Sequence, residues 1–186
     1  MSAPAFYDEL RALRLERVLD ASVEIITEEG WDRLTMTRVA QRSGVPRQSL
    51  YKEVGTKSEL GEAVVAREVD RFLAGVLESI DRHPDSVTEG LAAAARFALE
   101  HGETNEVLKA ILHPGQDPEL LALLTVRPEA VLGQAVKAIT DRLDASPTTE
   151  ALADTMVRLT LSHLLQPTVS VDEAVARIGR AVTAFA

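Results

Sequence analysis

The sequence contains no cysteine, which excludes disulfide bridges, thiolate zinc sites and cysteine nucleophiles. Aromatic residues make up only 4% of the chain while alanine and leucine are abundant, and this balance favours helices over sheets. No stretch approaches the roughly 20 apolar residues that a membrane-spanning helix needs. The N-terminal segment lacks the basic start and the apolar run of a signal peptide. We therefore expect a cytoplasmic, nucleoid-associated protein without membrane contact.

The motifs of common catalytic sites are also missing. The sequence has no nucleophile elbow, no zinc-protease motif, no phosphate loop and no dinucleotide fingerprint. Its histidines do not stand at metal-ligand spacing with other His, Asp or Glu residues. These absences predict that the protein is not an enzyme and that it needs neither a metal nor a cofactor.

Apolar residues recur at helical spacing along nearly the whole chain. One stripe runs from Leu15 to Ile26 and a longer one from Leu60 to Ile80. Further helices are expected near residues 86–101, 104–112, 117–125, 128–144, 148–166 and 171–185, with prolines at several of their ends. Alternating strand patterns are missing, so the expected fold class is all-α.

Short helices bounded by closely spaced capping, glycine and proline residues are expected just before Leu60. Thr35 can cap the first of them, and Gly44 can take the positive φ of a tight turn at its end. Pro46 then suits the first turn of a second short helix, because its missing N–H has no partner to lose there. Thr56 can cap the long helix that follows. Two short helices joined by a glycine turn predict a helix-turn-helix.

The second short helix carries side chains suited to reading DNA. Arg47 and Gln48 can pair in bidentate geometry with guanine and adenine. Tyr51 and Lys52 share their face and can reach phosphates, and Ser49 is small enough for close backbone approach. The alternative interpretation is an ordinary solvated face of a short helix.

Charge is distributed unevenly along the chain. The window from Arg33 to Lys57 holds six basic residues and one acidic residue, a net charge of +5. The whole chain has a net charge of −9, so the residues outside this window have a net charge of −14. A basic island on an acidic body suits a protein that touches phosphates with one surface. A chance cluster of solvated charges remains the alternative.

A series of short motifs from residue 18 to residue 60 resembles the N-terminal domain of the tetracycline-repressor family. They are Val18-Leu19-Asp20-Ala21, Gly30-Trp31, Thr35-Met36-Thr37-Arg38-Val39-Ala40, Ser43-Gly44-Val45, Ser49-Leu50-Tyr51 and Lys57-Ser58-Glu59-Leu60. The resemblance implies a three-helix DNA-binding domain over residues 1–56 and a helical ligand-binding and dimerisation domain over residues 57–186. It also implies a ligand-responsive repressor that binds a palindromic operator in double-stranded DNA as a homodimer.

The resemblance also assigns roles to residues of this chain. Thr35 and Thr37 would touch the DNA backbone, and Lys57 would hold a phosphate at the start of the long helix. The full set of predicted DNA-binding residues is Thr35, Thr37, Pro46, Arg47, Gln48, Ser49, Tyr51, Lys52 and Lys57. Arg14 and Arg17 would either approach the DNA backbone or belong to a solvated helix end.

Four residues depart from the family pattern. Pro46 stands where a phosphate-binding Ser or Thr is common, and Glu53 replaces a common His and is expected to put a negative charge near phosphates. Val54 replaces an aromatic residue, and Gly55 follows where Pro is frequent. These departures leave the motif in place and bear on its contacts and specificity.

The C-terminal helices are expected to hold an effector pocket and a dimer interface. The predicted ligand-binding residues are Phe72, Phe97, His101, Leu112, His113, Met156, Thr160 and His163. The predicted dimer interface consists of Leu161, Leu164, Leu165, Val175, Ile178 and Val182 on the last two helices. For both sets, the alternative interpretation is the core of a single chain.

The predicted mechanism is a population shift. An unidentified small molecule would reposition the helix over residues 57–82 and change the separation of the two recognition helices, with a coupling of roughly 1–3 kcal/mol. Besides a repressor and an enzyme, a helical interaction module that does not bind DNA remains an alternative, since the net charge is −9. Salt sensitivity distinguishes a repressor from such a module, because binding that neutralises phosphates weakens steeply with salt.

Overall fold

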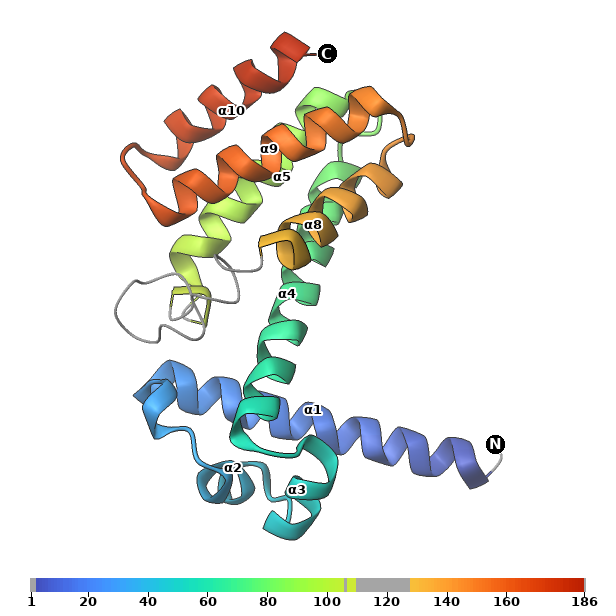
Figure 1. Cartoon of the computed structure of the whole chain (residues 1–186), viewed down its shortest axis with the longest axis vertical. Helices are drawn as coiled ribbons and strands as arrows, with labels where there is room; N and C mark the ends of the chain where they lie inside the picture. Colours follow the sequence, from blue (N-terminus) through green and yellow to red (C-terminus); the bar gives the residue numbers. More distant parts are fainter. Residues whose placement is uncertain (1–2, 106, 110–127, 186) are drawn as a thin grey trace. The chain divides into compact units, whose positions relative to one another are not determined.

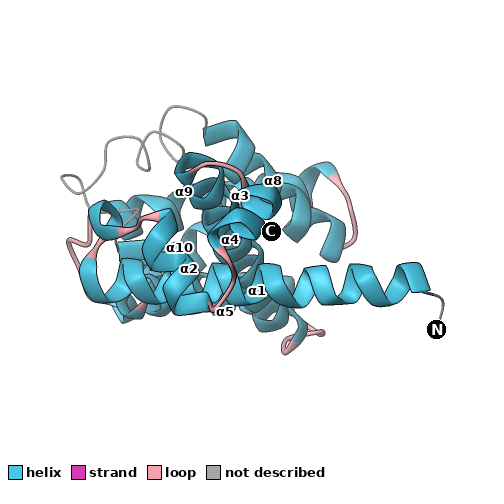
Figure 2. Cartoon of the chain, turned by 90° about the horizontal axis from the view of Figure 1, so that it is seen from below, coloured by secondary structure: helices cyan, strands magenta, loops and turns pink. Residues whose placement is uncertain are grey.

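The computed structural model describes residues 3–105, 107–109 and 128–185, and every regular element in these ranges is a helix (Figure 1). Figure 2 shows helices joined by loops, without a strand in the described part of the chain. The elements are α1 (Ala3–Glu29), the 3-10 helix η1 (Trp31–Arg33), α2 (Met36–Ser43), α3 (Arg47–Val54), α4 (Lys57–Asp81), α5 (Val87–Thr104), α8 (Pro128–Arg142), α9 (Pro147–Leu165) and α10 (Val171–Phe185). The all-α prediction is confirmed. No helix among the described residues is long and apolar enough to cross a membrane.

The chain divides into two units, Met1–Val69 and Asp70–Ala186. This division falls inside α4, which is one continuous helix that contributes its first half to one unit and its second half to the other. The domain boundary expected between residues 56 and 57 falls at the start of this helix and stays a prediction.

In the first unit, α1 packs against η1, α2 and α3. The core of this unit consists of Val18, Leu19, Ala21, Ile25, Ile26, Leu34, Met36, Val39, Val45, Leu50, Val54, Leu60 and Val64, all of them buried. Helix α1 begins well before the apolar stripe that predicted it. Leu10 and Leu13 are exposed, so this first part of the helix has no buried stripe, yet its residues favour helix and include no breaker after Pro4.

The short helices begin and end at the capping and turn residues that the sequence predicts. The Thr35 hydroxyl accepts a hydrogen bond from the Arg38 amide at 3.3 Å and caps α2. Gly44 has a φ of 69° at the other end of α2, a conformation that favours glycine. Arg17 donates to the Ser43 carbonyl at 2.7 Å, so its guanidinium provides a hydrogen-bond partner for a backbone carbonyl at the end of α2. Pro46 directly precedes α3.

The start of α4 is held by reciprocal hydrogen bonds. The Thr56 hydroxyl accepts from the Glu59 amide at 3.3 Å, and the Glu59 carboxylate accepts from the Thr56 amide at 2.7 Å. This is a capping box, which satisfies two backbone donors that the helix leaves unpaired. The hydrogen bonds from Thr56 lower the pKa of Glu59 below the ordinary value for a glutamate.

This capping box makes stability depend on pH. The folded pKa of Glu59 lies below its unfolded value, so its stabilising contribution is present above the unfolded pKa and is lost as pH falls through the folded pKa. We expect Glu59→Gln to be less stable than the parent at neutral pH and to approach it in acid. Urea unfolding followed by the fluorescence of Trp31, the single tryptophan of the chain, measures this difference. Glu62→Gln is the control for losing an exposed carboxylate from the same helix, and a similar pH-dependent difference there would contradict the assignment.

In the second unit, α5, α9 and α10 lie side by side, and α8 packs against α9 (Figure 1). Their shared core consists of Val76, Ile80, Leu91, Ala94, Ala95, Ala98, Leu99, Ile139, Leu152, Ala153, Met156, Ala174, Ile178 and Val182. Ser86 and Ser146 cap α5 and α9 by accepting backbone hydrogen bonds. The predicted helices near residues 86–101, 128–144, 148–166 and 171–185 are confirmed to within a few residues at each end. Those near residues 104–112 and 117–125 lie wholly or partly outside the described residues.

Candidate nucleic-acid interface and ligand cavities

Helix α3 has one buried face and one exposed face. Leu50 is completely buried and Val54 nearly so, and both pack into the core of the first unit. Arg47, Gln48 and Lys52 are exposed, as is Tyr51 with 45% of its surface accessible. Helical spacing puts Gln48 and Lys52 on the side of α3 away from Leu50. Arg47 lies one turn before Leu50 and is exposed as the first residue of the helix.

Two side chains on the exposed face contact each other. The Arg47 guanidinium lies 5.5 Å from the centre of the Tyr51 ring, and its Nη2 donates to the Tyr51 hydroxyl at 3.4 Å. A guanidinium over an aromatic ring is attracted to the negative face of that ring. This contact restricts Arg47 at the first turn of α3, where a recognition helix contacts base edges.

Acidic residues of α1 neutralise part of the basic island. Arg38 forms an ion pair with Glu29, and Arg42 donates to Glu24 at 3.2 Å and to Glu28 at 2.9 Å. The hydrogen bond from Arg42 lowers the pKa of Glu28, and the same contact raises the pKa of Arg42. The island is therefore less positive at the helix-turn-helix than a count along the sequence indicates.

The structure corrects the expectation for Glu53. Its side chain is only 11% exposed, and it accepts a hydrogen bond from Arg14 at 3.1 Å. The negative charge therefore faces α1 and is compensated there, instead of lying open to phosphates. This pair also shows that Arg14 connects α1 to α3. The second carboxylate oxygen of Glu53 is buried without a hydrogen-bond partner.

Lys57 at the start of α4 is engaged with Trp31. Its Nζ donates to the Trp31 carbonyl at 3.2 Å and lies 4.9 Å from the centre of the Trp31 ring. The same ring covers Gly61, where an added Cβ would lie 2.1 Å from it. Lys57 keeps further donor capacity, since an ammonium group has three N–H donors. Its phosphate contact stays a prediction.

The remaining predicted DNA-binding residues lie around α2 and α3. Thr35, Thr37 and Pro46 are exposed, and Ser49 is half-buried. The Thr35 hydroxyl already caps α2, so as an acceptor it is partly used within the chain.

Three of the predicted ligand-binding residues form one aromatic cluster in the second unit. The rings of Phe97 and His101 stack with centres 5.3 Å apart, and Phe72 lies 6.1 Å from Phe97 and 5.8 Å from His101. His101 also makes a hydrogen bond of 3.0 Å with the side-chain amide of Asn105. Phe97 covers Gly75, where an added Cβ would lie 2.2 Å from its ring. Sequence reasoning missed this glycine, because a small residue in an apolar helix carries no signal of what covers it.

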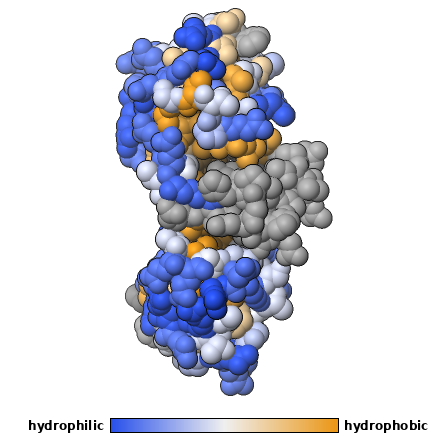
Figure 3. Space-filling view, turned by 90° about the vertical axis from the view of Figure 1, so that its left-hand side faces the viewer, coloured by the Kyte–Doolittle hydropathy of each residue, from blue (hydrophilic) through white to orange (hydrophobic). Residues whose placement is uncertain are grey.

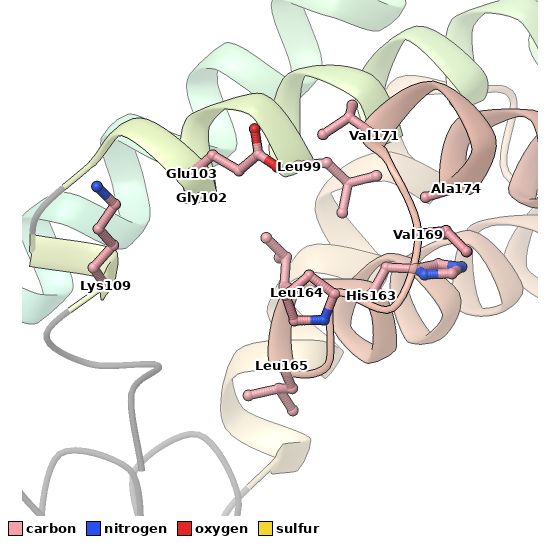
Figure 4. Close-up of a pocket in the computed structure, with 11 residues that line it drawn as sticks. Leu99, Gly102, Glu103, Lys109, His163, Leu164, Leu165, Val169, Val171 and Ala174 are labelled. Carbon is pink, nitrogen blue, oxygen red and sulfur yellow. The ribbon is translucent and has the colours of Figure 1, made fainter. Parts of the chain in front are cut away.

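The other predicted ligand-binding residues are divided between two cavities. Met156 and Thr160 line a cavity of about 100 Å³, to which Phe72 of the aromatic cluster also contributes. His163 lines a larger pocket of about 490 Å³ between α5, α9 and the loop before α10 (Figure 4). Leu164 lines both. Leu112 and His113 lie outside the described residues. No group of three or more metal-binding side chains occurs in the part of the chain that the structure describes.

The residues predicted for the dimer interface fall into two groups. Ile178 and Val182 have no exposed surface, because side chains of the same chain cover them completely, and they belong to the core of the second unit. They therefore have no surface left with which to meet a second copy. Leu161, Leu164, Leu165 and Val175 are half-buried. Hydrophobic side chains reach the surface of the second unit between hydrophilic ones (Figure 3).

Comparisons with known proteins agree with this arrangement. Residues 18–64 match the family described as bacterial regulatory proteins, tetR family, and residues 86–184 match the bacterial tetracyclin repressor, C-terminal domain. The chain is 28% identical to the HTH-type transcriptional regulator AlkX of Mycobacterium tuberculosis over 182 residues, which cover 95% of this chain and 86% of AlkX. It is 29% identical to the HTH-type transcriptional activator FasR of Mycolicibacterium smegmatis over 119 residues, 63% of this chain and 54% of FasR.

A solved structure shares the fold across both units. It is that of the TetR family repressor AlkX from Dietzia sp. strain DQ12-45-1b, implicated in biodegradation of n-alkanes, with a TM-score of 0.70 and 22% identity. The match covers 91% of this chain and 93% of the solved one.

Proposed function

This chain belongs to the tetracycline-repressor family of DNA-binding transcriptional regulators, and on that premise we propose that it represses transcription as a ligand-responsive homodimer. Each copy would place α3 in the major groove of one half of a palindromic operator. The observation that carries this proposal is that α3 exposes Arg47, Gln48, Tyr51 and Lys52 while the buried Leu50 anchors the helix. Arg and Gln are the side chains that read guanine and adenine by paired hydrogen bonds.

Dimerisation is supported by the surface of the last two helices. Leu161 and Leu165 of α9 and Val175 of α10 keep part of their surface exposed in a single chain. Two apolar helices at the end of a chain can pair with their copies as a four-helix bundle about a two-fold axis. Such symmetry suits an operator whose half-sites lie one helical turn apart.

Response to a small molecule is supported by the cavities of the second unit. The cavity beside Met156 and Thr160 lies in the core formed by α4, α5, α8 and α9, so filling it would act directly on the packing of these helices. Because α4 is one continuous helix that begins in the DNA-binding unit, a shift of its second half would be transmitted along the helix to the helix-turn-helix. By linkage, effector and operator then weaken each other equally.

Footprinting and transcription on DNA from upstream of the gene for this chain test the proposal. We expect protection of two symmetric half-sites with centres about ten base pairs apart, a complex with two copies per duplex, and reduced transcription. A complex with one copy at full affinity would contradict the dimer. Increased transcription would contradict repression and favour an activator, the role named for the relative FasR.

A further inference from the structure

The smaller cavity of the second unit is lined almost entirely by apolar side chains. Phe72, Ile139, Met156 and Leu164 contribute to it, and Thr160 supplies its side-chain hydroxyl. That hydroxyl donates to the Met156 sulfur at 3.5 Å. A buried water needs two to four polar partners, and about 30 Å³ of liquid volume. The cavity of about 100 Å³ has room for water but offers it few polar partners.

Leu164 forms the wall between this cavity and the larger pocket. It lines both, and its Cδ2 lies against Gly102, where an added Cβ would be 2.3 Å away. In Figure 4, Leu99 and Leu164 face each other across the larger pocket. Among the residues that the structure describes, Leu164 is the one that lines both cavities, so its side chain lies where the two spaces approach each other. The space beside Met156 is apolar.

We propose that the two cavities together bind an unbranched alkyl chain, whose inner end carries no charge and fills the space beside Met156 after Leu164 moves aside. The outer end lies in the larger pocket, where Glu103, Lys109 and His163 provide a polar rim. A charged group at the inner end is excluded, because the cavity offers no counter-charge and only one hydroxyl. This inference rests on the proposed function in one respect, since it names the chemical class of the effector.

Binding is tested on the full chain with carbon-13 labelled methionine methyl groups. The sequence has three methionines, and Met156 lines the cavity whereas Met36 lies in the other unit. We expect octanol and octane to shift the Met156 signal saturably, with affinity rising roughly fourfold for each methylene from hexanol to octanol. Diaminooctane, the same chain with an ammonium group at each end, should bind at least about tenfold more weakly than octanol.

Two variants locate the binding site. Ala98 lines the cavity and Ala74 is exposed on α4, so Ala98→Leu should abolish the octanol shift and Ala74→Leu should leave it unchanged. If Ala98→Leu fails to fold, Leu164→Ala replaces it, and removal of the wall should let decanol gain further affinity over octanol. An unchanged Met156 signal with octanol, or equal binding of diaminooctane, would overturn the inference.

Operator binding is measured separately on the same samples. A chain that binds octanol but no DNA would contradict the proposed function and leave the cavity assignment standing. A chain that binds its operator but not octanol would overturn only the alkyl-chain inference. A shift with octane and octanol alike identifies the alkyl chain as the recognised group, whereas a shift with octanol alone would mean that the hydroxyl is required and would overturn it.

Discussion

Replacing Arg47 and Gln48 together with alanine is expected to lower the affinity for operator DNA at least about a hundredfold, because each bidentate contact to a base contributes about 1–3 kcal/mol. Both side chains are exposed in the first turn of α3, so their removal leaves the core of the DNA-binding unit intact. Affinity for unrelated DNA should fall far less, since that binding depends on phosphate contacts. Fluorescence anisotropy with operator and unrelated duplexes measures both affinities.

Arg42→Ala is the matched control for the loss of a positive charge. Arg42 also belongs to the basic island, but its guanidinium is bound to Glu24 and Glu28 of α1. Its replacement should therefore change operator affinity much less than the double substitution in α3. Equal operator binding by the double variant and the parent would mean that α3 presents a different face to DNA.

Leu50→Ala is expected to destabilise the DNA-binding unit by about 2–5 kcal/mol, the range for truncating a fully buried leucine. Leu50 has no exposed surface and anchors α3 in the core of the DNA-binding unit. Because a small unit has a total stability of about 5–15 kcal/mol, this loss removes a large part of it. Urea unfolding followed by Trp31 fluorescence reports on this unit, since Trp31 packs over Gly61 within it.

Tyr51→Ala separates stability from DNA binding at the neighbouring position. Tyr51 is exposed, so its truncation should change the free energy of unfolding by no more than about 0.5 kcal/mol. It should weaken DNA binding through the loss of a phosphate contact and of the ring that restrains Arg47. A stability loss in Tyr51→Ala as large as in Leu50→Ala would contradict the two-faced description of α3.

The helix-turn-helix could be predicted because its signals are local. Thr35, Gly44 and Thr56 act on backbone groups within a few residues of themselves, and the structure confirms all three roles. The exposure of Gln48 and Lys52 follows from their helical spacing relative to Leu50, whereas that of Arg47 depends on its position at the start of α3. Chemistry of this kind is readable from short stretches of sequence.

Contacts between distant segments could not be predicted in the same way. Arg14 and Glu53 are 39 positions apart, and Arg42 and Glu28 are 14 apart, so no spacing rule connects them. These pairs changed the interpretation of Glu53 and of the basic island. The cavities depend on still more distant neighbours. Leu164 lies between the two cavities because Gly102, on another helix, has no side chain to occupy that position. Apolar periodicity does not reveal this contact.

The salt dependence of operator binding tests the central claim most directly. If Lys52 and Lys57 from each of two copies neutralise about four phosphates, the affinity should fall roughly a hundredfold between about 50 and 200 mM salt, with a logarithmic slope near −3.6. That result, with saturation at two copies per duplex, is what a dimeric DNA-binding regulator predicts. Operator affinity that stays constant across this range, or no binding at the lowest salt, would contradict it.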